Sequence, residues 1–339
     1  DRFEEIAKSD PNKNVYPSYL EVSFSNACNF ACSYCSPEIS SKWMEDINKY
    51  GQYPTKHGAH NLDYLKSSGK YPYKHSEDNP YVTAFWKWFP DALPYLKVFR
   101  ITGGEPTMSK DTWKVLDYLL ENPQYKIDIA INSNLGVPDV LIDKLIKKLN
   151  QLQEVGINVD IYTSIESTGE QAEYARDGLN YKQWLDNVNK VLELTKSKVA
   201  IMTTINILSL PTFTDFIKTL MDLRAKHNTS FEYNRVPLSV NYLRWPPHLQ
   251  CSLLDTKERV KYANDIETIC NSWLKYNSPE KFARLYLEEW DQIKRFCEYL
   301  KTQTNAVEHR KDFVKFISEY DKRRSKDFYI TFKDYENLM

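Results

Sequence analysis

Three cysteines stand close together near the start of the chain, at Cys28, Cys32 and Cys35. The chain of 339 residues has six cysteines, and the other three are scattered over its last third. A secreted disulfide framework occurs in much smaller chains, so this spacing indicates metal or cluster ligation in a reducing compartment. Three thiolates in one short loop can hold one face of a cubane iron–sulfur cluster and leave one iron open. A structural zinc site would need a fourth ligand, and the nearest histidine, His57, lies well outside the loop.

The cysteine loop directly follows a segment that alternates in the manner of a β-strand, residues 20–25. A glycine-rich turn, Gly103-Gly104-Glu105, follows another predicted strand, residues 98–102. In parallel α/β barrels, residues at the C-terminal ends of strands carry the chemistry. We therefore expect the two turns to lie at the same rim of one sheet.

Short apolar runs and amphipathic stretches of helix length alternate along the first two thirds of the chain. The further predicted strands are residues 127–133, 159–164, 199–205 and 231–236, and the helices between them are residues 109–121, 138–152, 181–195 and 214–225. This alternation predicts a parallel sheet with helices outside it. Six units are too few for an eight-stranded barrel, so the predicted fold is a partial (β/α)6 barrel in the α/β class.

Two regions depart from this alternation of strands and helices. Residues 37–94 form an insertion rich in tyrosine, proline, lysine and histidine, which we interpret as a packed loop with short helices near residues 41–48 and 83–89. A cover over a substrate or a nucleic-acid surface is the alternative for this insertion. Beyond residue 243 the strand pattern stops, and three helices are predicted over residues 255–276, 279–301 and 306–324. The predicted organisation is an N-terminal extension (1–15), the barrel (16–243) and a helical C-terminal extension (244–339).

Composition excludes some classes of protein. Lys and Arg number 45 against 46 Asp and Glu, and a formal charge of −1 does not imply a polyanion-binding surface, with a local basic patch as the alternative. We therefore expect no nucleic-acid partner. No run of about 18 apolar residues and no secretory leader is visible, so we expect no membrane partner and a cytoplasmic location. An aromatic content of 14% excludes disorder as the main state of the chain.

The cysteine spacing, with Tyr34 before the last cysteine, resembles the signature of the radical S-adenosylmethionine (radical SAM) superfamily. The resemblance implies that Cys28, Cys32 and Cys35 ligate a [4Fe–4S] cluster whose open iron binds S-adenosylmethionine. Reductive cleavage of this cofactor would yield a 5′-deoxyadenosyl radical, which takes hydrogen from a substrate. It also implies an electron-donating partner such as flavodoxin or ferredoxin.

Further residues match the family at the expected places, over roughly residues 16–243. Gly103, Gly104 and Glu105 resemble its GGE motif, in which the glutamate accepts from the methionyl ammonium. For each of the remaining matches an ordinary loop or cap residue is the alternative. The candidates for binding the cofactor are Glu105, Ser164 and Arg176, followed by Glu166, Asn134 and Asn206.

The C-terminal third resembles the SPASM and Twitch branch of the family, which modifies peptides, proteins or small alcohols. The resemblance makes a peptide or protein side chain the leading substrate, with a small molecule or a nucleotide as the alternative. An auxiliary cluster is not expected, because Cys270 and Cys297 have the spacing of buried helix residues. Cys251 follows prolines, is expected to be exposed, and is a candidate hydrogen donor. From another class, the chain could be a non-catalytic iron–sulfur or zinc protein, for which a GGE turn has no use.

Overall fold

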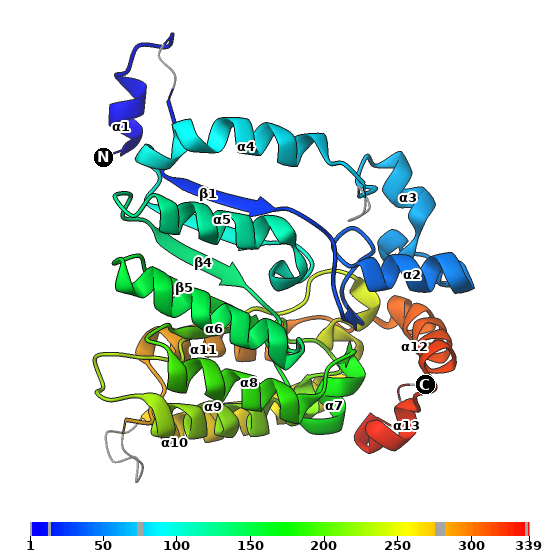
Figure 1. The fold of residues 1–339 in the computed structure, drawn as a ribbon. Helices are drawn as coiled ribbons and strands as arrows, with labels where there is room; N and C mark the ends of the chain where they lie inside the picture. The colour runs from blue at the N-terminus through cyan, green and yellow to red at the C-terminus, as the bar shows by residue number, and fades with distance from the viewer. Residues whose placement is uncertain (1, 13–14, 73–76, 275–281, 336–337, 339) are drawn as a thin grey trace.

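The computed structural model describes residues 2–12, 15–72, 77–274, 282–335 and 338. Its main sheet has six parallel strands in the order β1-β3-β4-β5-β7-β8 (Figure 1). The strands are β1 Tyr19–Ser23, β3 Val98–Thr102, β4 Asp128–Asn132, β5 Val159–Ser164, β7 Val199–Met202 and β8 Leu238–Ser239. A second, two-stranded antiparallel sheet joins β2, Ala31–Cys32, to β6, Arg176–Asp177.

One face of the main sheet is apolar and covered by helices. Alternate strand residues such as Phe99, Ile131 and Ile201 are fully buried on this face, and they belong to one continuous hydrophobic core. The covering helices are α5 Lys110–Glu121, α6 Asp139–Glu154, α8 Tyr181–Leu194 and α9 Phe213–His227, each packed against the next. The predicted fold class, a partial (β/α)6 barrel with a helical C-terminal extension, is therefore confirmed.

The prediction of a sixth strand over residues 231–236 is wrong, because these residues form no strand. The last strand is β8, and it begins only after Pro237. The carbonyls of Arg235 and Pro237 do accept bonds from β7, but proline has no N–H to donate, so the regular ladder is confined to two residues. The edge of the barrel is therefore shorter than the sequence pattern indicated.

The described residues of the insertion between β1 and β3 are largely helical. Its elements are α2 Ser41–Tyr50, η1 Gly58–His60, α3 Leu62–Ser67 and α4 Pro80–Ala92, and η2 Leu93–Tyr95 follows α4. In Figure 1, α4 runs along the edge of the sheet beside β1. Phe89 of α4 lies 5.4 Å from Phe99 of β3, measured between ring centroids, so this part of the insertion belongs to the core.

The C-terminal third is helical beyond β8. Its elements are η5 Pro247–Leu249, η6 Cys251–Leu253, α10 Thr256–Leu274, α11 Leu287–Thr302, η7 Val307–His309, α12 Arg310–Arg324, α13 Phe328–Thr331 and η8 Lys333–Tyr335. The helix predicted from residue 279 begins only at Leu287, and residues 275–281 lie outside the described residues. A buried ion pair of 2.5 Å between Arg224 and Glu289 fastens α11 to α9 of the barrel. The boundary at residues 243–244 stays a prediction.

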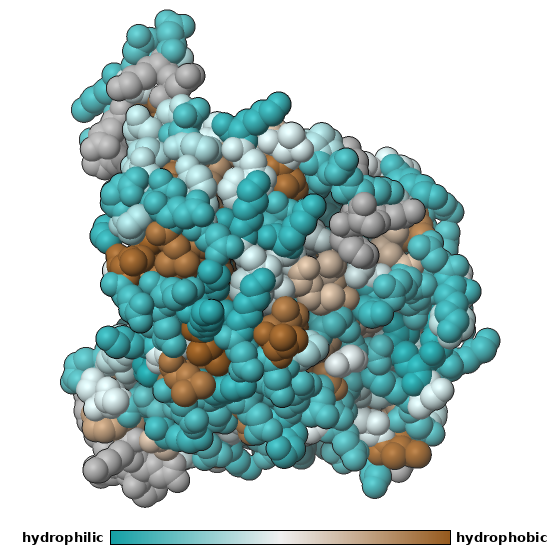
Figure 2. All heavy atoms as spheres, in the orientation of Figure 1, coloured by the Kyte–Doolittle hydropathy of each residue, from teal (hydrophilic) through white to brown (hydrophobic). Residues whose placement is uncertain are grey.

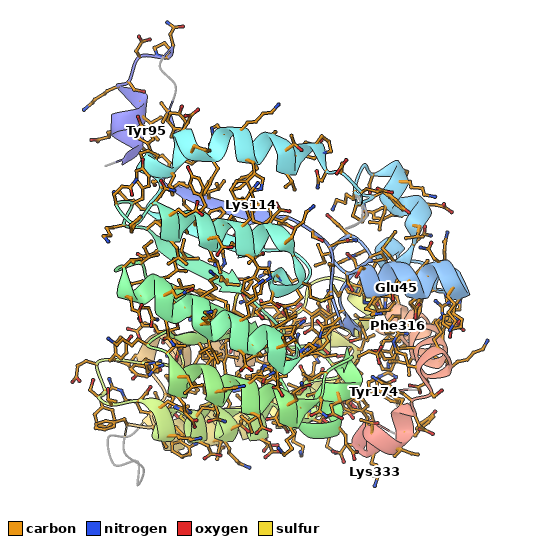
Figure 3. The ribbon with its side chains drawn as sticks, in the orientation of Figure 1. Glu45, Tyr95, Lys114, Tyr174, Phe316 and Lys333 are labelled. Carbon is orange, nitrogen blue, oxygen red and sulfur yellow. The ribbon has the colours of Figure 1, made fainter. Side chains whose placement is uncertain are left out.

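The remaining elements are short. They are α1 Arg2–Ala7, η3 Pro106–Met108, α7 Gly169–Ala175 and η4 Leu210–Thr212. Figure 3 shows Phe316 of α12 and Tyr174 of α7 on the side of the molecule where α2 lies. Arg323 of α12 binds Asp46 of α2 at 2.8 Å, so the C-terminal extension is docked on the insertion.

The surface seen in Figure 2 is largely hydrophilic, and its hydrophobic residues lie in small separate groups. Within the described ranges, no helix combines the length and the apolar character that a membrane crossing requires.

Candidate active site

The cysteine loop leaves β1 at the C-terminal edge of the parallel sheet and is fastened on two sides. Cys32 pairs with Arg176 across the small antiparallel sheet, and the amide of Ser33 donates to the Ala175 carbonyl at 2.7 Å. On the other side, the hydroxyl of Ser40, which caps α2, donates to the Phe30 carbonyl at 2.7 Å. The loop is thus held between the insertion and the segment that follows β5.

All three cysteines of the loop are free thiols. Burial raises the pKa of Cys28 to about 12, and burial also raises the pKa values of Cys32 and Cys35. Thiols in this environment become thiolates only beside added positive charge, which bound iron supplies. The donor set therefore fits an iron–sulfur cluster.

Within the part of the chain that the structure describes, no three His, Cys, Asp or Glu side chains converge as ligands of a single metal ion. A cubane cluster needs no such convergence, because each thiolate binds a different iron. A single structural zinc ion would need such convergence.

A buried polar network lies beside Cys32. Arg176 donates to Glu166 Oε2 at 2.7 Å and lies 3.8 Å from Cys32 Sγ. The Tyr34 hydroxyl donates to Glu166 Oε1 at 2.9 Å, and the guanidinium lies 5.4 Å from the Tyr34 ring centroid. Burial alone would lower the pKa of Arg176, but the carboxylate of Glu166 raises it. The structure thus brings two predicted residues, Glu166 and Arg176, to one predicted cluster ligand.

One donor of this network is unused. Arg176 Nε is buried without a hydrogen-bond partner among the described residues. A buried guanidinium N–H without an acceptor is costly, so this atom is suited to a ligand that brings one, such as a carboxylate. This observation fits S-adenosylmethionine, whose methionyl part carries a carboxylate.

The GGE turn packs directly on the cysteine loop. A Cβ at Gly104 would lie 2.3 Å from the Ala27 carbonyl oxygen, and one at Gly103, whose φ is +119°, would lie 2.7 Å from that of Ser25. The amide of Glu105 donates to the Ala27 carbonyl at 2.7 Å. The two glycines are therefore needed for close approach of the two loops to each other.

Glu105 is 1% exposed and is held by its own neighbours. Its Oε1 accepts from the Thr107 amide and hydroxyl and from the Ser133 hydroxyl, and its Oε2 accepts from the Asn134 amide at 2.7 Å. Burial raises its pKa, which these hydrogen bonds oppose. A carboxylate offers about four acceptor sites, so Oε2 retains capacity for one more donor.

The other predicted residues are more dispersed. Asn134 bonds the cysteine loop through Asn29 Oδ1 at 2.8 Å. Asn206 is fully buried in its own turn, where its side chain bonds the Thr204 carbonyl and the Leu208 amide. Ser164 ends β5 and is partly exposed.

Sequence reasoning missed Asn29, Thr107 and Ser133, which connect the predicted residues. Thr107 stands two residues after Glu105, the spacing at which a side-chain oxygen caps a turn, and that signal could have found it. Asn29 and Ser133 are ordinary loop residues, and nothing in their spacing predicts their partners.

The three C-terminal cysteines all lie in the core. Cys270 and Cys297 are fully buried, as predicted. The expectation that Cys251 is exposed is wrong: its side chain is 2% exposed, because η6 folds it into the core. Cys251 could donate hydrogen to a substrate only if the packing around it opened.

Comparisons with known proteins add an independent line of evidence. The family model described as "Radical SAM superfamily" matches residues 22–223, which is more than half of the chain. Two curated relatives are GTP 3′,8-cyclases. That of Aliarcobacter butzleri is 28% identical over 157 residues, which are 45% of this chain and 37% of that protein, and that of Pectobacterium atrosepticum is 24% identical over 205 residues, 59% of this chain and 51% of that protein. A third relative, the radical SAM cyclopropyl synthase TigE of Paramaledivibacter caminithermalis, is 24% identical over 214 residues, 62% of this chain and 39% of that protein.

The chain thus spans about half, or less, of the length of the curated relatives it matches. A solved structure, Streptococcus suis SuiB bound to precursor peptide SuiA, aligns with a TM-score of 0.42 and 12% identity over 86% of this chain and 48% of that one. On the strength of the family match, the chain belongs to the radical SAM superfamily, whose enzymes use a [4Fe–4S] cluster and S-adenosylmethionine.

Proposed function

We propose that this chain is a radical SAM enzyme in which Cys28, Cys32 and Cys35 hold the [4Fe–4S] cluster. The cluster, when bound, supplies the electron that cleaves S-adenosylmethionine to methionine and a 5′-deoxyadenosyl radical, which takes hydrogen from the substrate. The observation that carries the proposal is the cysteine loop itself. It presents three free thiols at the C-terminal edge of a parallel sheet, fastened to both α2 and β6.

Arg176 and Glu105 are proposed to hold opposite ends of the methionyl group. The unpartnered Nε of Arg176 supports a bond to the carboxylate, and the remaining acceptor site on Glu105 Oε2 supports a bond from the ammonium. Glu166 orients Arg176 through their ion pair of 2.7 Å. Ser164, partly exposed at the end of β5, is proposed to bond the ribose.

The other predicted residues would act as supports. Asn134 would fix the turn after β4 to the cysteine loop, and Asn206 would shape the turn after β7. Gly103 and Gly104 would let the GGE turn lie close to the same loop. Each of these residues would therefore affect the cofactor through the backbone that it positions.

The proposed substrate is a peptide or protein side chain, supported by the resemblance to the SPASM and Twitch branch. A reductase of the flavodoxin or ferredoxin type would supply the electron, in a cytoplasmic setting that keeps the thiols reduced. Peptides deuterated at the attacked carbon should transfer label to 5′-deoxyadenosine, as read by mass spectrometry. Transfer from a labelled small molecule alone would contradict the peptide assignment.

The ligand set is tested by iron content. Anaerobically reconstituted wild-type protein should carry about four iron atoms per chain, and changing Cys28, Cys32 and Cys35 together to Ala should abolish this. The matched control is Cys270→Ala, a fully buried cysteine outside the loop, which should retain the iron. S-adenosylmethionine should also change the electron paramagnetic resonance spectrum of the reduced wild-type cluster. A triple variant that keeps its iron would overturn the ligand assignment.

A further inference from the structure

The face of the sheet opposite the helices is polar. Register places Ser23 beside Thr102, and Ser164 and Ser239 on either side of Met202. Because partners in a parallel ladder point to the same face, these side chains lie together inside the partial barrel. All but Ser23, which is exposed, are partly exposed, whereas the opposite face is buried except in the edge strand β1. The inside of the barrel thus offers hydroxyl groups to a ligand.

Arg100 of β3 stands in the middle of this inner face. Its Nε donates to Asn132 Oδ1 of β4 at 2.9 Å, and Nη2 lies 3.6 Å from Met202 Sδ of β7. Its guanidinium lies 4.2 Å from the ring centroid of Tyr162 of β5. Contacts from three strands therefore fix the orientation of the guanidinium, and Nη1 has no hydrogen-bond partner among the described residues.

No carboxylate neutralises this cation in the described part of the chain. Arg176, Arg224 and Arg323, which are also enclosed, each have a carboxylate oxygen within 2.8 Å. Arg259, which is fully buried, has no carboxylate partner among the described residues and instead bonds the Leu254 and Leu300 carbonyls and Asn305 Oδ1. Glu21 is aligned with Arg100 across β1 and β3, but its carboxylate accepts from the Tyr19 hydroxyl at 2.9 Å and forms no ion pair with Arg100. A fixed, partly buried guanidinium with a free N–H group and no counterion has the chemistry to bind an anion.

We infer that the substrate carries an anionic group, a carboxylate or a phosphate, that binds Arg100 inside the barrel. This inference rests on the proposed function for the identity of the ligand as substrate. Arg100 would donate through Nη1 and Nη2 to two oxygens of the anion, and the hydroxyl of Thr102, on the same face of β3, would bond a remaining polar atom. For a peptide substrate, the anion is an acidic side chain or the C-terminal carboxylate.

The test measures anion binding without any turnover. Anaerobically reconstituted protein, without S-adenosylmethionine or reductant, is titrated with inorganic phosphate, followed by ³¹P line width, and with succinate as competitor at constant ionic strength. Arg100→Gln should weaken binding at least tenfold, and Arg100→Lys should lie between it and the wild type, because the charge stays and the planar fork is lost. The matched control Arg244→Gln, which removes an exposed cation stacked on Tyr242, should bind as the wild type does.

Each outcome decides the inference. Tighter binding of phosphate than of succinate would identify a phosphate-bearing substrate, and the reverse a carboxylate. Equal binding by the wild type and Arg100→Gln, with circular dichroism showing both folded, would overturn the site, and so would no binding of either anion. If Arg100→Gln does not fold, Arg100→Lys binding as tightly as the wild type would also overturn it. Wild-type protein that binds phosphate through Arg100 but never cleaves S-adenosylmethionine would contradict the proposed function and leave the anion site standing.

Discussion

At the scale of single residues, the candidate site depends on the contact between a cation and a thiol. Arg176 lies 3.8 Å from Cys32 Sγ and is paired with Glu166 at 2.7 Å, with both charged side chains almost completely buried. A positive charge beside a ligand sulfur favours the thiolate over the thiol. Glu166 and Tyr34 fix that charge in position.

Breaking this pair should destabilise the protein. Glu166→Gln leaves the Arg176 charge buried without its counterion and should lower the free energy of unfolding by about 3–5 kcal/mol. The double variant Glu166→Gln with Arg176→Gln removes both charges and should recover part of the loss. Urea unfolding of reconstituted protein measures both. A double variant no more stable than Glu166→Gln would show that the pair is not coupled.

The sequence predicted these residues singly but not their contacts. Cys28, Cys32 and Cys35 were found because three thiols in one loop are a local pattern. Glu166 and Arg176 lie ten residues apart in the chain, and their ion pair forms only because α7 returns the chain toward the cysteine loop. Arg100 was missed, although a charged residue within the apolar strand VFRIT is a signal for a polar inner face.

At the scale of elements, the site depends on two loops that lie in backbone contact. The GGE turn approaches the cysteine loop so closely that a Cβ at Gly104 would overlap the Ala27 carbonyl, 2.3 Å away. Because the obstructing atoms are backbone, no rotamer change relieves the overlap. The elements that place both loops are β1 and β3, which are adjacent and parallel.

Gly104→Ala should therefore separate the two loops. We expect a loss of about 1–3 kcal/mol in stability from overpacking and a lower iron content after reconstitution, because the cysteine loop moves. The matched control is Gly156→Ala, where the new Cβ would meet only the end of the Lys126 side chain, at 3.3 Å, although the positive φ of +79° strains it. Iron assays on both variants test the prediction. Equal iron content in the two would contradict the docking role of Gly104.

Most strands of the main sheet could be predicted because each is an apolar run followed by a turn. The predicted strands 98–102 and 159–164 coincide with β3 and β5. β2 and β6 have two residues each, too few for any periodicity, so the pairing that holds the cysteine loop was not predictable. β8 was displaced from its predicted range because Pro237 interrupts the ladder.

At the scale of the whole molecule, the insertion and the C-terminal extension close around a group of histidines. His57 Nε2 lies 3.4 Å from His309 Nδ1, and the ring centroids of His60 and His248 are 6.5 Å apart. His248 is fully buried, and neither ring nitrogen has a hydrogen-bond partner among the described residues. Sequence patterns predicted the two regions but not that they meet, because their contacts join residues about 250 positions apart.

This interface should weaken in acid. Burial, with smaller contributions from His57 and His309, lowers the pKa of His248 from 6.5 to about 4, although Asp312 opposes the shift. Between pH 4 and pH 6.5 the unfolded state therefore binds more protons than the folded state. The contribution of His248 to the free energy of unfolding is complete above about pH 6.5 and is lost as the pH is lowered toward 4. The pKa shift of His248 corresponds to a loss of about 3 kcal/mol in the free energy of unfolding over this range.

Urea unfolding at several values between pH 7 and pH 4.5 measures this dependence. His248→Phe removes the titrating group and keeps an aromatic ring against Phe316, so its stability should depend less on pH than that of the wild type. Burial also lowers the pKa of His60, which should leave a residual slope in the variant. Identical pH profiles for the variant and the wild type would contradict the role of His248.

The central claim is that this fold cleaves S-adenosylmethionine by one-electron reduction at the cluster held by Cys28, Cys32 and Cys35. The most direct measurement incubates the reconstituted wild-type protein with dithionite and S-adenosylmethionine under anaerobic conditions and identifies the products by mass spectrometry. We predict slow formation of 5′-deoxyadenosine and methionine even without substrate, and none in the protein with all three cysteines changed to Ala. Bound but intact S-adenosylmethionine, or S-adenosylhomocysteine in place of 5′-deoxyadenosine, would contradict the claim.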